Sequence, residues 1–96
     1  MKGSQRKYLR GLAHSYKPQA IVGKNALTEG ALNSIMRCLD SNELMKIKFS
    51  DKEYMMSSKN IIEDKLNCHI VGDIGKILII YKKNFDKTEN NIVLPD

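Results

Sequence analysis

Apolar residues recur along this chain with two different spacings, and segments of the two kinds alternate. From Leu32 to Leu39 they follow the i, i+3, i+4, i+7 spacing, which places them on one face of an α-helix. From Met45 to Phe49 every second residue is apolar, which is the spacing of a β-strand with one buried face. Such a chain is expected to pack helices against a sheet, because neither kind of element can bury its apolar face alone.

The same reasoning predicts seven elements. Helices are predicted at about 4–16, 29–40 and 52–66, and strands at about 19–22, 43–49, 68–71 and 76–82. Thr28 and Asp51 are the expected N-caps of the second and third helices. Pro18 is expected to end the first helix near Tyr16, because a residue before proline avoids the helical conformation. The order α-β-α-β-α-β-β predicts a compact layered α/β domain with a four-stranded mixed sheet.

Finer expectations concern the strands and the tail. Lys46 and Lys48 lie opposite the apolar face of a strand that is expected to be only half-buried. The segment Gly72–Gly75 is expected to form the hairpin turn between the last two strands. Residues 84–96 are expected to form a polar tail that is loose up to residue 91, with Ile92–Leu94 docking back onto the body.

Length and charge narrow the class of protein. The 96 residues fit a single domain spanning 1–96, and 16 basic against 11 acidic residues give a net charge of +5. A basic domain favours polyanionic partners such as nucleic acid, and the alternative is an ordinary charged surface. The longest apolar run, Ile77–Tyr81, is far too short to span a membrane, and the N-terminal residues lack the apolar core of a signal peptide. Together with only two cysteines, Cys38 and Cys68, this predicts a soluble, cytoplasmic protein.

The segment Gly23-Lys24-Asn25-Ala26 stands between a predicted strand and a predicted helix. Backbone N–H groups at a helix N-terminus, with a glycine and a lysine beside them, form a natural phosphate site. Glycine also lets a sugar-phosphate backbone approach closely, because it has no side chain. The alternative is an ordinary strand-to-helix turn in which glycine supplies a special backbone conformation.

A second basic feature is a stripe on the first predicted helix. Arg6, Arg10 and His14 fall on one helical arc, and Lys17 follows just beyond it. These side chains are candidates for phosphate contacts, and the alternative is a solvated helix face. Because Lys17 and Lys24 flank the same short strand, the stripe and the loop either share one surface or lie at the two ends of the strand.

No pattern of residues indicates an enzyme. The cysteines and histidines do not have metal-ligand spacing, and the acidic residues do not form a paired constellation for acid–base chemistry. The segment Gly72–Lys76 lacks the spacing of a phosphate-binding Walker motif. The sequence therefore predicts no metal, no cofactor and no small-molecule substrate.

Several segments resemble the YhbY-like family of stand-alone CRM (chloroplast RNA splicing and ribosome maturation) domains. The specific stretch is Leu9–Gly30, in which Leu-Arg-Gly-Leu-Ala-His, Lys-Pro and Val-Gly-Lys-Asn-Ala-Leu-Thr-Glu-Gly occur in order. Leu44–Lys48, Ile74–Lys82 and Val93–Pro95 match as well, so the resemblance covers nearly the whole chain. It implies an α-β-α-β-α-β-β fold similar to the C-terminal domain of bacterial translation initiation factor three.

The resemblance also implies a function. Members of the family bind RNA without catalysis, and the bacterial stand-alone members associate with precursors of the large ribosomal subunit. Their RNA-contacting loop is a GxxG segment like that of KH domains, which here aligns with Gly23, Lys24, Asn25 and Ala26. Ala26 departs from the pattern, and its methyl group is expected to hinder a close phosphate contact or to alter the backbone angle. We expect a monomeric RNA-binding assembly factor, and the alternative is an adaptor that docks on a ribosomal protein or assembly factor.

Overall fold

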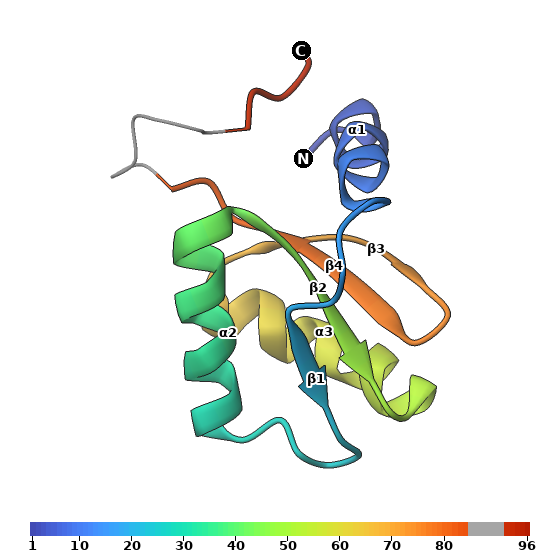
Figure 1. The fold of residues 1–96 in the computed structure, drawn as a ribbon, viewed down its shortest axis with the longest axis vertical. Helices are drawn as coiled ribbons and strands as arrows, with labels where there is room; N and C mark the ends of the chain where they lie inside the picture. Colours follow the sequence, from blue (N-terminus) through green and yellow to red (C-terminus); the bar gives the residue numbers. More distant parts are fainter. Residues whose placement is uncertain (85–91) are drawn as a thin grey trace.

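The computed structural model describes residues 1–84 and 92–96, and it confirms the predicted order of elements (Figure 1). The helices are α1 (Gly3–Ala13), α2 (Glu29–Asn42) and α3 (Lys52–Leu66). The strands are β1 (Ala20–Val22), β2 (Leu44–Phe49), β3 (His69–Ile74) and β4 (Ile77–Tyr81).

The four strands form one mixed sheet, as predicted, and the structure shows that their order is β1-β2-β4-β3. β1 runs parallel to β2, and β4 runs antiparallel to both of its neighbours. The carboxyl ends of β1 and β2 therefore meet the start of β4, with Val22 paired to Phe49 and Lys48 paired to Ile77. We call this the loop end of the sheet, because the segment Gly23–Ala26 follows β1 there.

The helices cover the two faces of the sheet unequally. On one face α2 and α3 enclose the larger core, which includes Ile35, Phe49 and Ile62. On the other face α1 packs through Leu9 and Ala13 against a smaller cluster that includes Leu44, Ile79 and Tyr81. Figure 1 shows α1 at the opposite end of the molecule from the loop that follows β1. The second face is therefore covered mainly at the end of the sheet away from that loop.

The expectation that β2 is half-buried, with Lys46 on an open face, is wrong. Only 8% of Lys46 is exposed, and its Nζ donates to the carbonyl oxygens of Tyr16 at 3.0 Å and His14 at 3.4 Å. The connection from α1 to β1 passes over this part of the sheet, and its carbonyl groups need donors. Lys48, one step closer to the loop end on the same face, is exposed as expected.

The helix ends follow the predicted chemistry in two of three cases. The Thr28 hydroxyl accepts a hydrogen bond from the Ala31 N–H at 3.1 Å, and the Asp51 carboxylate accepts one from the Tyr54 N–H at 2.8 Å. Both N-cap predictions are confirmed. α1 ends at Ala13 and not near Tyr16, because the chain tightens there into turns with i to i+3 hydrogen bonds.

The turn between β3 and β4 is shorter than predicted. β3 continues through Gly72 and Asp73 to Ile74, and the turn consists of Gly75 and Lys76. Gly75 has a φ of 59°, a left-handed conformation that glycine adopts without steric cost and that suits a two-residue hairpin turn. A register shift between Ile70 and Gly72 shows that β3 contains a bulge before the turn.

Two of the three C-terminal residues predicted to dock back onto the body do so, whereas Val93 is 81% exposed. Ile92 and Leu94 pack against the smaller cluster beneath α1, and the Gln5 Nε2 donates to the Pro95 carbonyl oxygen at 3.1 Å. The prediction that residues 84–91 are loose concerns residues that, apart from Asn84, lie outside the described part of the chain.

The buried carboxylate of Glu43 accepts hydrogen bonds from two residues of the C-terminal tail. The two oxygens of Glu43 accept hydrogen bonds from the Asn84 N–H at 2.7 Å and the Ile92 N–H at 2.8 Å. Glu43 is also the residue that ends α2, with a φ of 61°. Burial, and to a smaller degree the Glu43 carboxylate, raises the pKa of Tyr81, so this phenol stays neutral beside it. One side chain thus joins the end of α2 to the C-terminal tail.

Candidate nucleic-acid interface

The loop Gly23–Ala26 is a tight turn between β1 and α2. The Ala26 N–H donates to the Gly23 carbonyl oxygen at 3.0 Å, which closes the turn. Its base is held by α3, since the Leu27 N–H donates to the Tyr54 hydroxyl at 2.9 Å. The tip, Lys24 to Ala26, is exposed. The fold therefore presents this loop on a fixed base at the edge of the molecule.

The backbone of the loop differs from what a GxxG pattern suggests. Asn25 takes the left-handed conformation with a φ of 59°, which asparagine adopts more readily than most residues. Neither Gly23 nor Ala26 has a positive φ. Ala26 is thus compatible with the backbone of this turn, and its methyl group does not force a different conformation.

The tip of the loop has backbone N–H groups that are available to bind a ligand. Within the part of the chain that the structure describes, the N–H groups of Lys24 and Asn25 have no protein acceptor. Both residues are exposed, and Lys24 adds a positively charged side chain to the same turn. Two free N–H groups and a cation just before a helix N-terminus match the requirements of an anion site.

The stripe on α1 is partly used by the fold itself. The Arg6 Nε donates to the Ile70 carbonyl oxygen at 3.3 Å, and the Arg10 Nη1 donates to the Val71 carbonyl oxygen at 3.4 Å. Both arginines thus bind carbonyl groups of the edge strand β3. Each guanidinium has five N–H donors, so donors remain for other partners. His14 is exposed beyond them.

The stripe and the loop lie at the two ends of β1, which settles the alternatives left by the sequence. Lys17 precedes the strand and Lys24 follows it, both exposed. Figure 1 shows α1 and the loop that follows β1 at opposite ends of the molecule. The structure therefore does not bring the stripe and the loop into one compact site.

The loop has other basic neighbours that sequence reasoning missed. Lys48 is paired with Ile21 across the β1–β2 ladder, and Lys76 lies in the turn directly before β4, where its carbonyl oxygen accepts from the Phe49 N–H. Both lysines are exposed at the loop end of the sheet. No local pattern could have grouped them with Lys24, because strand pairing joins segments that are far apart in the sequence.

Comparison with known proteins decides the family. A family model of the CRS1 / YhbY (CRM) domain matches residues 1–82. The chain belongs to the CRM domain family. It is 37% identical over 93 residues to a Haemophilus influenzae protein named an RNA-binding protein, covering 95% of this chain and 91% of that one. It is 33% identical over 90 residues to a Pseudomonas aeruginosa protein named a probable RNA-binding protein, covering 90% of this chain and 85% of that one.

The fold of this CRM domain is also found in a solved structure. The solution structure of a hypothetical protein from Staphylococcus aureus superposes with a TM-score of 0.83, at 28% identity, and 99% of each chain is covered. The family resemblance and the α/β fold predicted from the sequence are therefore confirmed. The roles of Gly23–Ala26 and of the stripe on α1 stay predictions.

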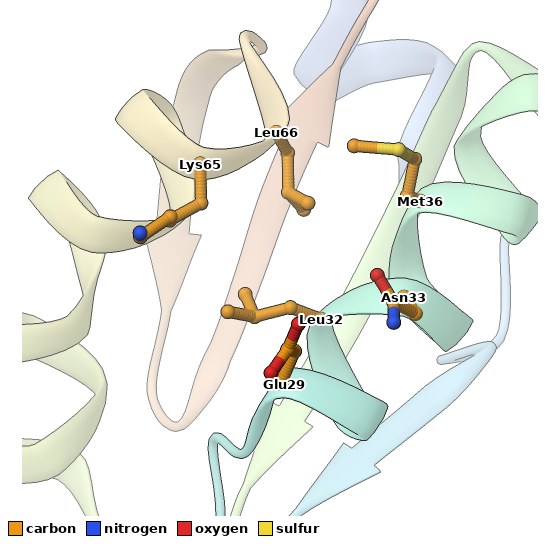
Figure 2. Close-up of a pocket in the computed structure, with 6 residues that line it drawn as sticks. All are labelled: Glu29, Leu32, Asn33, Met36, Lys65 and Leu66. Carbon is orange, nitrogen blue, oxygen red and sulfur yellow. The ribbon is translucent and has the colours of Figure 1, made fainter.

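The CRM domain also has a groove between α2 and α3. These two helices pack on the sheet face opposite to the one that carries Lys48. Figure 2 shows Leu32, Met36 and Leu66 pointing toward one another across the groove, while Lys65 points away. The groove holds about 370 Å³, and Glu29 lies at its rim. Three of its six lining residues are apolar and three are polar or charged, and none is a cysteine or histidine. It resembles a seam between two packed helices more than a catalytic centre.

The described residues of the CRM domain contain no group of three side chains suited to hold a metal ion. In residues 1–84 and 92–96 no helix is both long enough and apolar enough to cross a membrane.

The Cys68 thiol is buried, and this burial, with a smaller contribution from Glu63, raises its pKa to about 11. A thiol with this pKa carries almost no thiolate at neutral pH and is a poor nucleophile.

Proposed function

We propose that this CRM domain binds RNA through the sugar-phosphate backbone, gripped by the loop Gly23–Ala26, and that it does not catalyse a reaction. The net charge of +5 favours a polyanionic partner. The two relatives described above carry names that refer to RNA binding. The further proposal is that the RNA is ribosomal RNA in a precursor of the large subunit, met in the cytoplasm by a monomer.

The observation that carries the proposal is that the N–H groups of Lys24 and Asn25 have no acceptor among the described residues and lie in an exposed turn that also carries the lysine side chain. Phosphate oxygens are strong acceptors for backbone N–H groups at a helix N-terminus and for an ammonium group. Gly23 supports this role. A Cβ there would meet only the Ala26 Cβ at 3.7 Å, an ordinary contact, so the fold itself does not require glycine. The missing side chain keeps the backbone open to a phosphate.

The ribosomal part of the proposal is tested by sedimentation. Tagged protein in a cell lysate is run on a sucrose gradient at modest salt. Co-migration with large-subunit particles or their precursors, lost when the salt is raised, is the expected result. Co-migration that survives high salt and does not depend on RNA would point instead to docking on a ribosomal protein. Protein found only at the top of the gradient would contradict the ribosomal target while leaving RNA binding to be measured directly.

Lys24→Glu is expected to weaken RNA binding about tenfold at low salt, because it places a carboxylate beside a phosphate. The loss should be similar for RNAs of different sequence, since phosphate contacts position a protein and do not read bases. The slope of log K against log salt should also become shallower by about one. Fluorescence polarisation with two unrelated labelled RNAs, each titrated at several salt concentrations, measures both quantities.

Arg37→Glu is the matched control. It changes the net charge by the same amount, and Arg37 is exposed on α2, about 13 Å along the helix from its N-cap. Its effect should be clearly smaller than that of Lys24→Glu. Equal losses would mean that net charge alone attracts RNA and that the loop has no special role.

Ala26→Gly is expected to bind RNA at least as tightly as the parent protein. Ala26 does not have a positive φ, so glycine is not needed for the turn, but removing the exposed methyl group opens the loop further. The same polarisation titration measures the change. A clear loss of affinity, with an unchanged melting temperature, would contradict the proposed approach of the phosphate.

A further inference from the structure

The sheet carries a row of side chains across its four strands at the loop end, of which three are exposed and Ile77 is half-buried. Strand register places Ile21 of β1 beside Lys48 of β2, Lys48 beside Ile77 of β4, and Ile77 beside Ile74 of β3. These four residues lie on the face that α1 covers only at the other end. Ile21 is 78% exposed and Ile74 is 59% exposed. We call Ile21, Lys48, Ile77 and Ile74 the open row.

Ile21 and Ile74 lie on the two edge strands of the same sheet face and leave apolar surface facing water on both sides of Lys48 and Ile77. The sheet does not need them for its core, because Val22 and Leu78 supply the buried face at the same positions along β1 and β4. Ile21 also lies directly before the loop, since Gly23 follows it by two residues. The open row and the loop therefore form one continuous surface.

The surroundings of the open row are basic. Lys48 lies within it, and the exposed side chains of Lys24 and Lys76 lie at the loop end. On the α1 side, the Arg10 side chain lies over Gly72, where a Cβ would come within 3.0 Å of the Arg10 Cδ. The nearby acidic residue Asp73 points to the opposite face, where its Oδ2 pairs with the Lys59 Nζ at 2.5 Å. The row is thus an apolar strip framed by cations and turned away from the neighbouring carboxylate.

We infer that the open row binds the unpaired bases of a single-stranded RNA segment whose backbone is held by the loop, an inference that rests on the proposed RNA binding. Base faces bury apolar surface when they pack on aliphatic side chains, and only unpaired bases expose those faces. Three strand spacings make the row about 14 Å long, which suits two or three bases. Lys48, Lys76 and Arg10 then neutralise the adjoining phosphates.

The test removes the apolar surface without removing charge. The double variant Ile21→Ala/Ile74→Ala is titrated by polarisation with a labelled single-stranded RNA of about a dozen nucleotides and with a duplex of the same length. Affinity for the single strand should fall about tenfold or more, with the salt slope unchanged. Affinity for the duplex should stay within about twofold, because its bases are not accessible. The double variant Ile21→Thr/Ile74→Thr, which keeps the β-branched shape, should behave in the same way.

Ile61→Ala is the matched control. Ile61 is 48% exposed on α3, which packs on the other face of the sheet, so its replacement should leave both affinities unchanged. Single-strand affinity that is unchanged in both double variants, or that falls equally for single strand and duplex, would overturn the inference. If Lys24→Glu still weakens binding in that case, the loop proposal stands without the open row. A parent protein that binds neither RNA at low salt would overturn both proposals.

Discussion

Lys46→Glu is expected to lower the free energy of unfolding by about 3–5 kcal/mol, because it buries a charge without a partner. The Lys46 ammonium is enclosed and donates to the carbonyl oxygens of His14 and Tyr16. A carboxylate at this position would face two oxygen atoms and repel both. The two carbonyl groups would also lose their donor, and the connection from α1 to β1 would separate from the sheet. Urea unfolding followed by far-UV circular dichroism measures the change.

Two variants separate charge from packing in that experiment. Lys46→Met keeps most of the aliphatic stem and removes only the donor, so it should cost about 1–3 kcal/mol. Lys48→Glu makes the same charge change two residues away on the same face of β2, but Lys48 is exposed. Its effect should stay within about 0.5 kcal/mol. Equal stability of Lys46→Glu and Lys48→Glu would show that the Lys46 ammonium is not held as described.

Glu43→Ala is expected to lower the free energy of unfolding by about 2–4 kcal/mol and to release the C-terminal tail. The substitution removes the two charged acceptors of the Asn84 and Ile92 N–H groups, and hydrogen bonds to charged groups are the stronger ones. Without this anchor, Ile92 and Leu94 lose their hold on the cluster beneath α1. The unfolding curve measures the stability, and hydrogen exchange at the Ile92 amide measures the release of the tail.

Glu43→Gln and Asp40→Ala complete that series. Glutamine keeps one acceptor oxygen, so about half of the stability should be retained. Asp40 is an exposed acidic residue near the same end of α2, and its replacement should have little effect. Exchange at the Ile92 amide that is as slow in Glu43→Ala as in the parent would show that the tail is anchored by other contacts.

Local sequence patterns predicted much of this fold because they record local physics. Thr28 and Asp51 cap their helices, as residues with short polar side chains at those positions should. The i, i+3, i+4 spacing of α2 and the period of two in β2 identified the faces that pack together in the larger core. The loop Gly23–Ala26 could be recognised as a candidate site for the same reason, since strand, turn and helix start are contiguous in the chain.

Features that join distant segments could not be predicted in this way. The sequence shows Lys46 and Lys48 as two equivalent lysines on one face of a strand, yet one is buried and the other is exposed. The difference arises because α1 and the connection to β1 cover only half of that face. Similarly, the hairpin turn consists of Gly75 and Lys76 and not of the predicted segment Gly72–Gly75. The register of β3 on β4, including its bulge, determines where the strand ends.

The chain's own periodicity and cap residues thus determined the number, order and kind of its elements and placed a basic loop between β1 and α2. Packing in three dimensions determined which side chains that loop has as neighbours. The pairing of β1, β2, β4 and β3 brings together Ile21, Lys48, Ile77 and Ile74, which are separated by up to 56 residues in the sequence. The position of α1 then leaves Ile21, Lys48 and Ile74 of this row exposed. Hydrogen-bond register and burial depend on contacts between distant segments, and a one-dimensional pattern does not contain them.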